Sequence, residues 1–145
     1  MSIMPKNLDN SGLKSIVDKY DLFFIDIWGV IHNGVSLFKK SIKCLDELDD
    51  LGKKYILLTN APRPNITVIN FLKNMGLANN KCAKVFTSGQ AALSYLNENC
   101  KNLKFFHIGP ARDFDLFKSF EKKKVENIND SDFLLCTGLF EDYEK

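Results

Sequence analysis

Phe23-Phe24-Ile25-Asp26-Ile27 and Tyr55-Ile56-Leu57-Leu58-Thr59 are the two apolar runs that decide the fold. Each has the length and the aromatic or β-branched content of a strand. Neither alternates regularly with polar residues, which is typical of strands buried on both faces of a parallel sheet. Between them, residues 40–51 carry apolar side chains at helical spacing, and Gly52 follows where a helix favours a left-handed residue. The order strand, helix, strand predicts a βαβ unit.

The same alternation continues along the chain. A loop at residues 60–63 opens a predicted helix with Pro64 near its first turn and Gly76 at its end. The further expected elements are a helix over 11–20, a strand near 85–86, a helix over 90–99, a strand over 103–108, a helix over 112–120 and a strand over 133–137. We therefore predict an α/β fold with a parallel sheet in residues 1–82 and a second α/β unit in residues 83–145.

Length and composition exclude several classes of protein. The 145 residues match one ordinary domain, and 45% apolar with 26% charged residues is a globular composition. Lys and Arg number 20 against 18 Asp and Glu, which is too balanced to indicate nucleic-acid binding. No apolar segment reaches the roughly 18 residues that span a bilayer, and the N-terminus does not resemble a secretory signal. The four cysteines are scattered, which favours free thiols. We expect a cytoplasmic protein with no nucleic-acid or membrane partner.

Polar side chains stand where both apolar runs end. Asp26 closes the first run, and Thr59 and Asn60 close the second. Open parallel sheets bind ligands at the carboxyl ends of their strands. A carboxylate can ligate Mg²⁺ or attack phosphorus, and a hydroxyl with backbone N–H groups can hold phosphate oxygens. The alternative is that Asp26 caps a turn and Thr59-Asn60 opens one; the residues alone leave both open.

Two motifs carry a resemblance to a known family. They are Asp26-Ile27-Trp28-Gly29-Val30-Ile31-His32-Asn33-Gly34 and Leu57-Leu58-Thr59-Asn60-Ala61-Pro62-Arg63-Pro64. Together they resemble the haloacid dehalogenase (HAD) superfamily, and more narrowly the NagD-like and p-nitrophenyl-phosphatase-like proteins of subfamily IIA. Within it they resemble an uncharacterised group with Asp-x-Trp-Gly in its first motif. The resemblance covers residues 21–139. It implies an incomplete HAD-like Rossmannoid core in residues 1–82 and the start of an α/β cap of the C2 type in residues 83–145.

The resemblance also implies an activity and a set of roles. It implies a Mg²⁺-dependent phosphatase that acts on a small phosphorylated metabolite through an aspartyl-phosphate. Asp26 would be the nucleophile and a metal ligand, the backbone carbonyl of Trp28 a second metal ligand, and Thr59 with Asn60 the phosphate-binding pair. Arg63 stands in the loop of the second motif, where a guanidinium suits phosphate; solvation of the helix entry is its alternative role.

Two departures from the superfamily bear on activity. Trp28 occupies the position where most HAD phosphatases have a second Asp as general acid and base, and an indole N–H cannot shuttle a proton at neutral pH. The later Lys and Gly-Asp motifs, which lie beyond the cap in subfamily IIA, are absent. We therefore expect an N-terminal half that self-associates or pairs with a complementary C-terminal half. The alternative function is a truncated or split gene product, or a pseudoenzyme, that binds a ligand or partner without catalysis.

Overall fold

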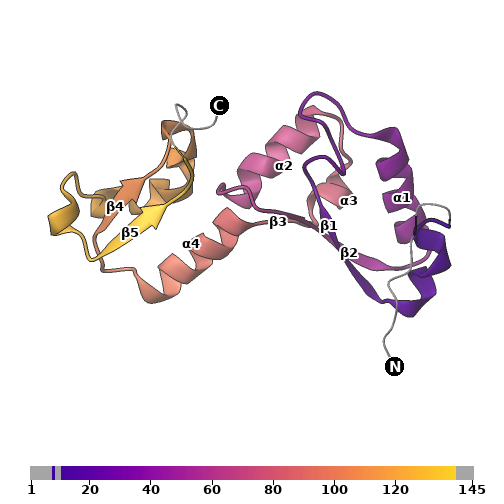
Figure 1. Cartoon of the computed structure of the whole chain (residues 1–145), viewed down its shortest axis with the longest axis horizontal. Helices are drawn as coiled ribbons and strands as arrows, with labels where there is room; N and C mark the ends of the chain where they lie inside the picture. The colour runs from indigo at the N-terminus through magenta and orange to yellow at the C-terminus, as the bar shows by residue number, and fades with distance from the viewer. Residues whose placement is uncertain (1–7, 9–10, 140–145) are drawn as a thin grey trace.

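The computed structural model describes residue 8 and residues 11–139. The first parallel sheet has the order β1 (Leu22–Asp26), β2 (Lys54–Thr59), β3 (Val85–Thr87). A second, two-stranded parallel sheet consists of β4 (Phe105–Ile108) and β5 (Phe133–Cys136). The helix α4 (Ser88–Asn99) runs from one sheet towards the other (Figure 1). This architecture confirms the predicted α/β class.

Helices cover one face of the first sheet. They are α1 (Lys39–Asp50), α2 (Asn65–Asn74) and α3 (Asn79–Cys82). α1 ends as expected before Gly52, whose φ of 66° is accessible to glycine at little cost. The strand order with right-handed crossovers places both connections on the same side of the sheet. All three helices share one buried cluster with the strands, formed by Leu45, Leu48, Leu72, Cys82, Tyr55, Leu57 and Val85.

The opposite face of the first sheet is exposed within the described part of the chain. We call it the open face; it is formed by Leu22, Phe24, Ile56, Leu58 and Phe86. Phe24 is 65% exposed and Leu58 is 40% exposed. Within the described part of the chain, the expectation that β1 and β2 are buried on both faces is therefore wrong. An apolar run shows what a strand can bury, but the covering layer has to come from another segment.

The second unit packs around its own small cluster. Phe105 of β4 contacts Leu116 and Phe117 of η3 (Ala111–Lys123), and Leu93 of α4 packs against them. η3 is a 3₁₀ helix where an ordinary helix over 112–120 was expected. One further 3₁₀ turn, η4 (Ile128–Asp130), precedes β5.

The N-terminal segment also departs from the expected helix over 11–20. It forms two 3₁₀ turns, η1 (Leu13–Ser15) and η2 (Val17–Lys19). Ile16 separates them with a φ of −131°, which is outside the helical region.

The predicted division at residues 82/83 falls inside the first sheet. β3 pairs with β2 through Leu57↔Val85 and Thr59↔Thr87, so that sheet reaches beyond the predicted boundary. The division into a core part (1–82) and a C2-type cap (83–145) stays a prediction. No helix in the described residues is long and apolar enough to cross a membrane.

Candidate functional site at the carboxyl ends of β1 and β2

The first predicted site residues lie at one edge of the first sheet. β1 and β2 are adjacent and parallel, and Asp26 is paired in register with Leu58. Asp26 therefore lies beside Thr59 and Asn60, as expected if the two strands are neighbours. These three residues line a shallow hollow of about 510 Å³ with Phe24 and Leu58 of the open face.

Asp26 keeps most of its acceptor capacity. One carboxylate oxygen accepts a hydrogen bond from the N–H of Ile27 at 2.8 Å. Within the described residues no Lys, Arg or His forms an ion pair with it. The side chain is exposed on the open-face side of the strand. The carboxylate is thus held by its own backbone and is accessible to a ligand.

Thr59 and Asn60 approach the hollow from the second strand. Thr59 is only 9% exposed, and its hydroxyl oxygen accepts the N–H of Ala61 at 3.2 Å, so its proton is free to be donated. The carbonyl of Asn60 accepts the hydroxyl of Ser88 at 2.8 Å, which fixes the backbone and leaves the amide side chain exposed. Thr59 and Asn60 therefore line the same hollow as Asp26.

Trp28 borders a neighbouring hollow of about 370 Å³, which Thr59 and Asn60 also line. Its ring meets that of His32 edge to face, with centroids 5.3 Å apart. A Cβ at residue 34 would lie 2.9 Å from the indole, and the φ of Gly34 is 90°, so only glycine suits that position.

His32 has a structural role beside this site. It is buried, and its Nδ1 accepts the N–H of Gly34 at 2.8 Å. Burial lowers the pKa of His32, which favours the neutral ring that this hydrogen bond requires. His32 therefore supports the loop after β1.

Arg63 is not brought into either hollow. Its Nε lies 3.0 Å from both carboxylate oxygens of Asp115, and its Nη2 lies 2.9 Å from one of them. Asp115 belongs to η3 of the second unit, 52 residues away in sequence. No motif pointed to Asp115, since only the fold brings the two residues together. Arg63 as a phosphate ligand stays a prediction.

The edge of the first sheet where β1 and β2 end, which we call the rim, offers part of a metal site. Among residues 8 and 11–139, no group of three or more His, Cys, Asp or Glu side chains is placed to hold a metal ion. Mg²⁺ prefers about six oxygen ligands and is commonly held by one or two carboxylates with water and substrate phosphate. Asp26 and the carbonyl of Trp28 fit that pattern as a partial set, which other oxygens must complete.

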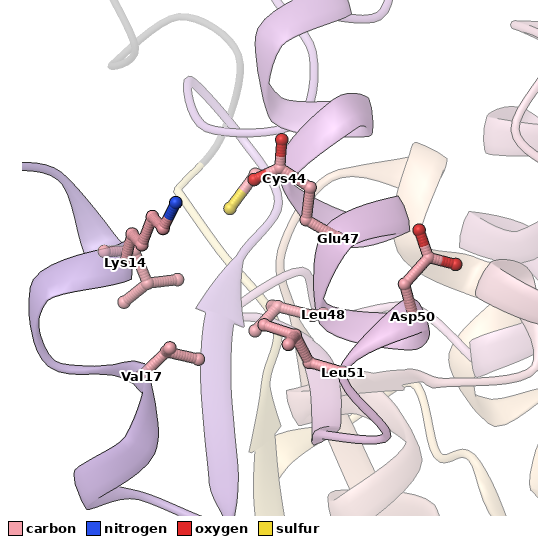
Figure 2. Close-up of a pocket in the computed structure, with 8 residues that line it drawn as sticks. Lys14, Val17, Cys44, Glu47, Leu48, Asp50 and Leu51 are labelled. Carbon is pink, nitrogen blue, oxygen red and sulfur yellow. The ribbon is translucent and has the colours of Figure 1, made fainter.

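A different pocket lies between η1, η2 and α1. It is open to solvent and has a volume of about 360 Å³, and its lining includes Leu13, Val17, Cys44 and Leu48 (Figure 2). Burial, followed by the nearby Glu47 carboxylate, raises the pKa of the Cys44 thiol, so the thiolate is disfavoured. This pocket contains none of the predicted site residues.

The family is decided by a match that covers most of the chain. The profile of the haloacid dehalogenase-like hydrolases matches residues 23–122. The chain belongs to this family. The match includes both motifs at the rim and extends into the second unit, so the HAD resemblance is confirmed.

Individual relatives of this HAD-family chain are phosphatases and hydrolases. It is 30% identical over 108 residues to phosphoglycolate phosphatase 2 of Arabidopsis thaliana, spanning 72% of the chain and 36% of that protein. It is 32% identical to a HAD-like hydrolase of Brucella suis, with a TM-score of 0.75 over 99% of the chain and 52% of that structure. A p-nitrophenyl phosphatase of Archaeoglobus fulgidus shares the fold at 22% identity, with a TM-score of 0.62 over 79% of the chain and 43% of that structure. The chain thus spans about half or less of each relative.

Proposed function

We propose that this chain carries the nucleophile and phosphate-binding part of a Mg²⁺-dependent phosphatase for a small phosphorylated metabolite. The observation that carries the proposal is the meeting of Asp26, Thr59 and Asn60 around one hollow at the ends of two adjacent parallel strands. The phosphatase relatives support the same reaction class. A glycerol phosphate phosphatase of Mycobacterium tuberculosis, which shares the fold, was solved in complex with magnesium.

The proposed reaction begins at the Asp26 carboxylate. One of its oxygens forms a bond to phosphorus while the bond from phosphorus to the leaving oxygen breaks, which gives an aspartyl-phosphate and an alkoxide or phenoxide. Water then attacks this intermediate, releases inorganic phosphate and restores the carboxylate. The Thr59 hydroxyl and the Asn60 amide donate hydrogen bonds to the phosphoryl oxygens, where negative charge is concentrated in the transition state. Arg63 is the further phosphate ligand predicted from the motif, and it must leave Asp115 to act as one.

Mg²⁺ belongs to the proposal as a ligand of Asp26 and of the Trp28 carbonyl. When bound, it neutralises charge on the phosphoryl group and orients that group towards the carboxylate. Without it, Asp26 and an anionic substrate repel each other in a hollow that provides no cation from the described residues.

Trp28 limits the substrates that this site can process. No carboxylic acid stands at position 28, so the departing oxygen must take its proton from water. General acid–base assistance contributes roughly 10²–10⁴-fold. Phosphate esters of good leaving groups, such as p-nitrophenyl phosphate, should therefore react, and simple alkyl phosphates should react slower by about that factor.

The open face supports a proposal for what completes the enzyme. Parallel sheets are covered on both faces in stable proteins, and Leu22, Phe24, Leu58 and Phe86 leave one face of this sheet apolar and exposed. The Brucella suis relative has about twice the length matched here. We infer that a complementary C-terminal polypeptide, equivalent to the rest of that relative, packs on this face. It would also border the hollow, because Phe24 and Leu58 line it.

Fluorescence of Trp28 tests the proposed site directly, because Trp28 is the sole tryptophan. The full chain is titrated with Mg²⁺ and then with inorganic phosphate. We expect a saturable change with each, loss of the Mg²⁺ response in Asp26→Asn, and loss of the phosphate response in Thr59→Val. Asp21→Asn removes the same charge from the opposite end of β1 and should respond like the parent chain.

Catalysis is tested with p-nitrophenyl phosphate on the full chain, alone and with the complementary polypeptide of the relative. Turnover that Asp26→Asn abolishes supports the proposal. Turnover that Asp26→Asn leaves intact contradicts the nucleophile. Ligand binding with no turnover in either setting would identify a binding protein without catalysis.

A further inference from the structure

Asp115 connects the second unit to the loop of the second motif. Its carboxylate accepts hydrogen bonds from the Nε and Nη2 of Arg63 and a further bond of 2.7 Å from the hydroxyl of Thr67. We call Arg63, Thr67 and Asp115 the loop clamp. Both ends of the ion pair are about one-third exposed, so the solvent screens it only in part. Bidentate pairing of this kind fixes geometry as well as supplying energy.

The same loop is also held by the end of β3 and the start of α4. The hydroxyl of Thr87 donates to the carbonyl of Arg63 at 2.6 Å, and the hydroxyl of Ser88 donates to the carbonyl of Ala61 at 2.9 Å. Gly89 packs so closely that a Cβ there would clash with the Arg63 backbone. The backbone of the loop is thus fixed by the α4 entry, while its one long charged side chain is fixed by η3.

The loop clamp lies close in sequence to Thr59 and Asn60. Thr59 ends β2, Asn60 begins the loop that contains Arg63, and the N–H of Ala61 bonds to the Thr59 hydroxyl. The Asp115 carboxylate therefore links η3 of the second unit to the loop that follows β2.

We propose that Asp115 is a positioning residue that sets the conformation of the second-motif loop by holding Arg63 and Thr67. It acts on the rim through Arg63 and does not itself contact the hollow. What the loop binds rests on the proposed function; the coupling between η3 and the loop does not.

The coupling is tested by amide hydrogen exchange on the full chain without phosphate or Mg²⁺. The reporters are the N–H groups of Ala61 and Asn65, which are bonded to Thr59 and Gln90. Loss of a charge-assisted pair in Asp115→Ala should raise their exchange roughly tenfold. Glu121→Gln, which removes a negative charge from the same 3₁₀ helix, should leave both unchanged. Unchanged exchange in Asp115→Ala, or an equal rise in Glu121→Gln, overturns the proposal.

Swapping the charges of residues 63 and 115 separates positioning by Asp115 from direct phosphate binding by Arg63. Arg63→Asp and Asp115→Arg each place like charges together, and the double variant restores an ion pair at the same place. We expect fast exchange at Ala61 in each single variant and near-parental exchange in the double variant. Exchange in the double variant as fast as in the singles overturns the proposal, and this comparison stays informative if Asp115→Ala does not fold.

The phosphate titration adds a readout that a structural role alone would not move. The double variant should recover the Trp28 response to inorganic phosphate that each single variant weakens. Slow exchange in the double variant without that response would support the coupling through Asp115 and give Arg63 the further role of a phosphate ligand. If the parent chain shows no phosphate response, the proposed function fails while the exchange results still decide the coupling.

Discussion

The two faces of the first sheet are built from the same strands, but helices bury one face while the other is exposed within the described residues. Leu57 is fully buried under the helices, and its neighbour Leu58 is 40% exposed on the open face. The candidate site lies where the two faces meet, because Thr59 belongs to the covered face and Asp26 to the open one. Packing therefore fixes the Thr59 side of the candidate site, while the Asp26 side is exposed within the described residues.

The largest effect should separate neighbouring leucines of β2. Leu57→Ala removes a fully buried side chain from the cluster under α1 and α2 and should lower the free energy of unfolding by about 3 kcal/mol. Leu58→Ala makes the same chemical change on the open face and should cost less than about 1 kcal/mol. Urea unfolding of both variants measures the difference. Equal losses would mean that the open face is covered in solution.

The next effect concerns charges on the covered side of the sheet. Lys81 is 4% exposed, and its Nζ lies 2.8 Å from carboxylate oxygens of Asp46 and Asp49. Partial burial by itself raises the pKa of Asp49, but hydrogen bonds from Lys81, Lys84 and Tyr55 outweigh it and lower the pKa to about 2. The carboxylates of this cluster are paired with lysines, whereas the carboxylate of Asp26 has no such cation within the described residues.

A carboxylate whose pKa is lower in the folded than in the unfolded chain contributes its full stabilisation only above the pKa of the unfolded chain. The contribution of Asp49 is present above pH 3.8 and is lost as the pH falls towards 2, a loss of about 2 kcal/mol. Unfolding midpoints measured between pH 5 and pH 2 should show this loss in the parent chain. Asp49→Asn should flatten the dependence, and Asp50→Asn, one residue along α1, should retain it. A parental slope in Asp49→Asn would contradict the assignment.

A smaller effect is expected from the open face itself. Phe24 and Phe86 are exposed aromatic side chains on this face, and such patches promote association. Replacing both with Ser should reduce concentration-dependent self-association in light scattering and change stability by less than about 1 kcal/mol. Phe71→Ser removes an exposed aromatic from α2 and serves as the control. Association that persists in the double variant would place the contact elsewhere.

The sequence predicted the elements of the fold better than their surroundings. Strands at Phe23–Ile27 and Tyr55–Thr59 were identified from local apolar runs, and Gly52 marked the end of a helix because that signal is also local. The same apolar content led to the wrong expectation for Phe24, because covering a strand depends on a distant segment. The 3₁₀ geometry of η3 was missed for a related reason, since apolar spacing does not distinguish it from an α-helix.

The candidate site shows the same limit. Asp26, Thr59 and Asn60 could be grouped from sequence, since parallel strands bring their carboxyl ends to one edge. Asp115 could not, because 52 residues separate it from Arg63 and no motif marks it. The burial of Lys81 could not be predicted from sequence either, because it depends on carboxylates of α1 that no pattern linked to it.

The smallest stability effect should come from the residue with the largest proposed functional effect. Asp26 is exposed and bonded only to the N–H of its neighbour among the described residues, so Asp26→Asn should shift the free energy of unfolding by less than about 0.5 kcal/mol. Urea unfolding checks this beside the Mg²⁺ titration of the same preparation. A stability loss near that of Leu57→Ala would make Asp26 a structural residue. Near-parental stability with a lost Mg²⁺ response would show that the carboxylate is retained for a ligand on the uncovered side of the sheet.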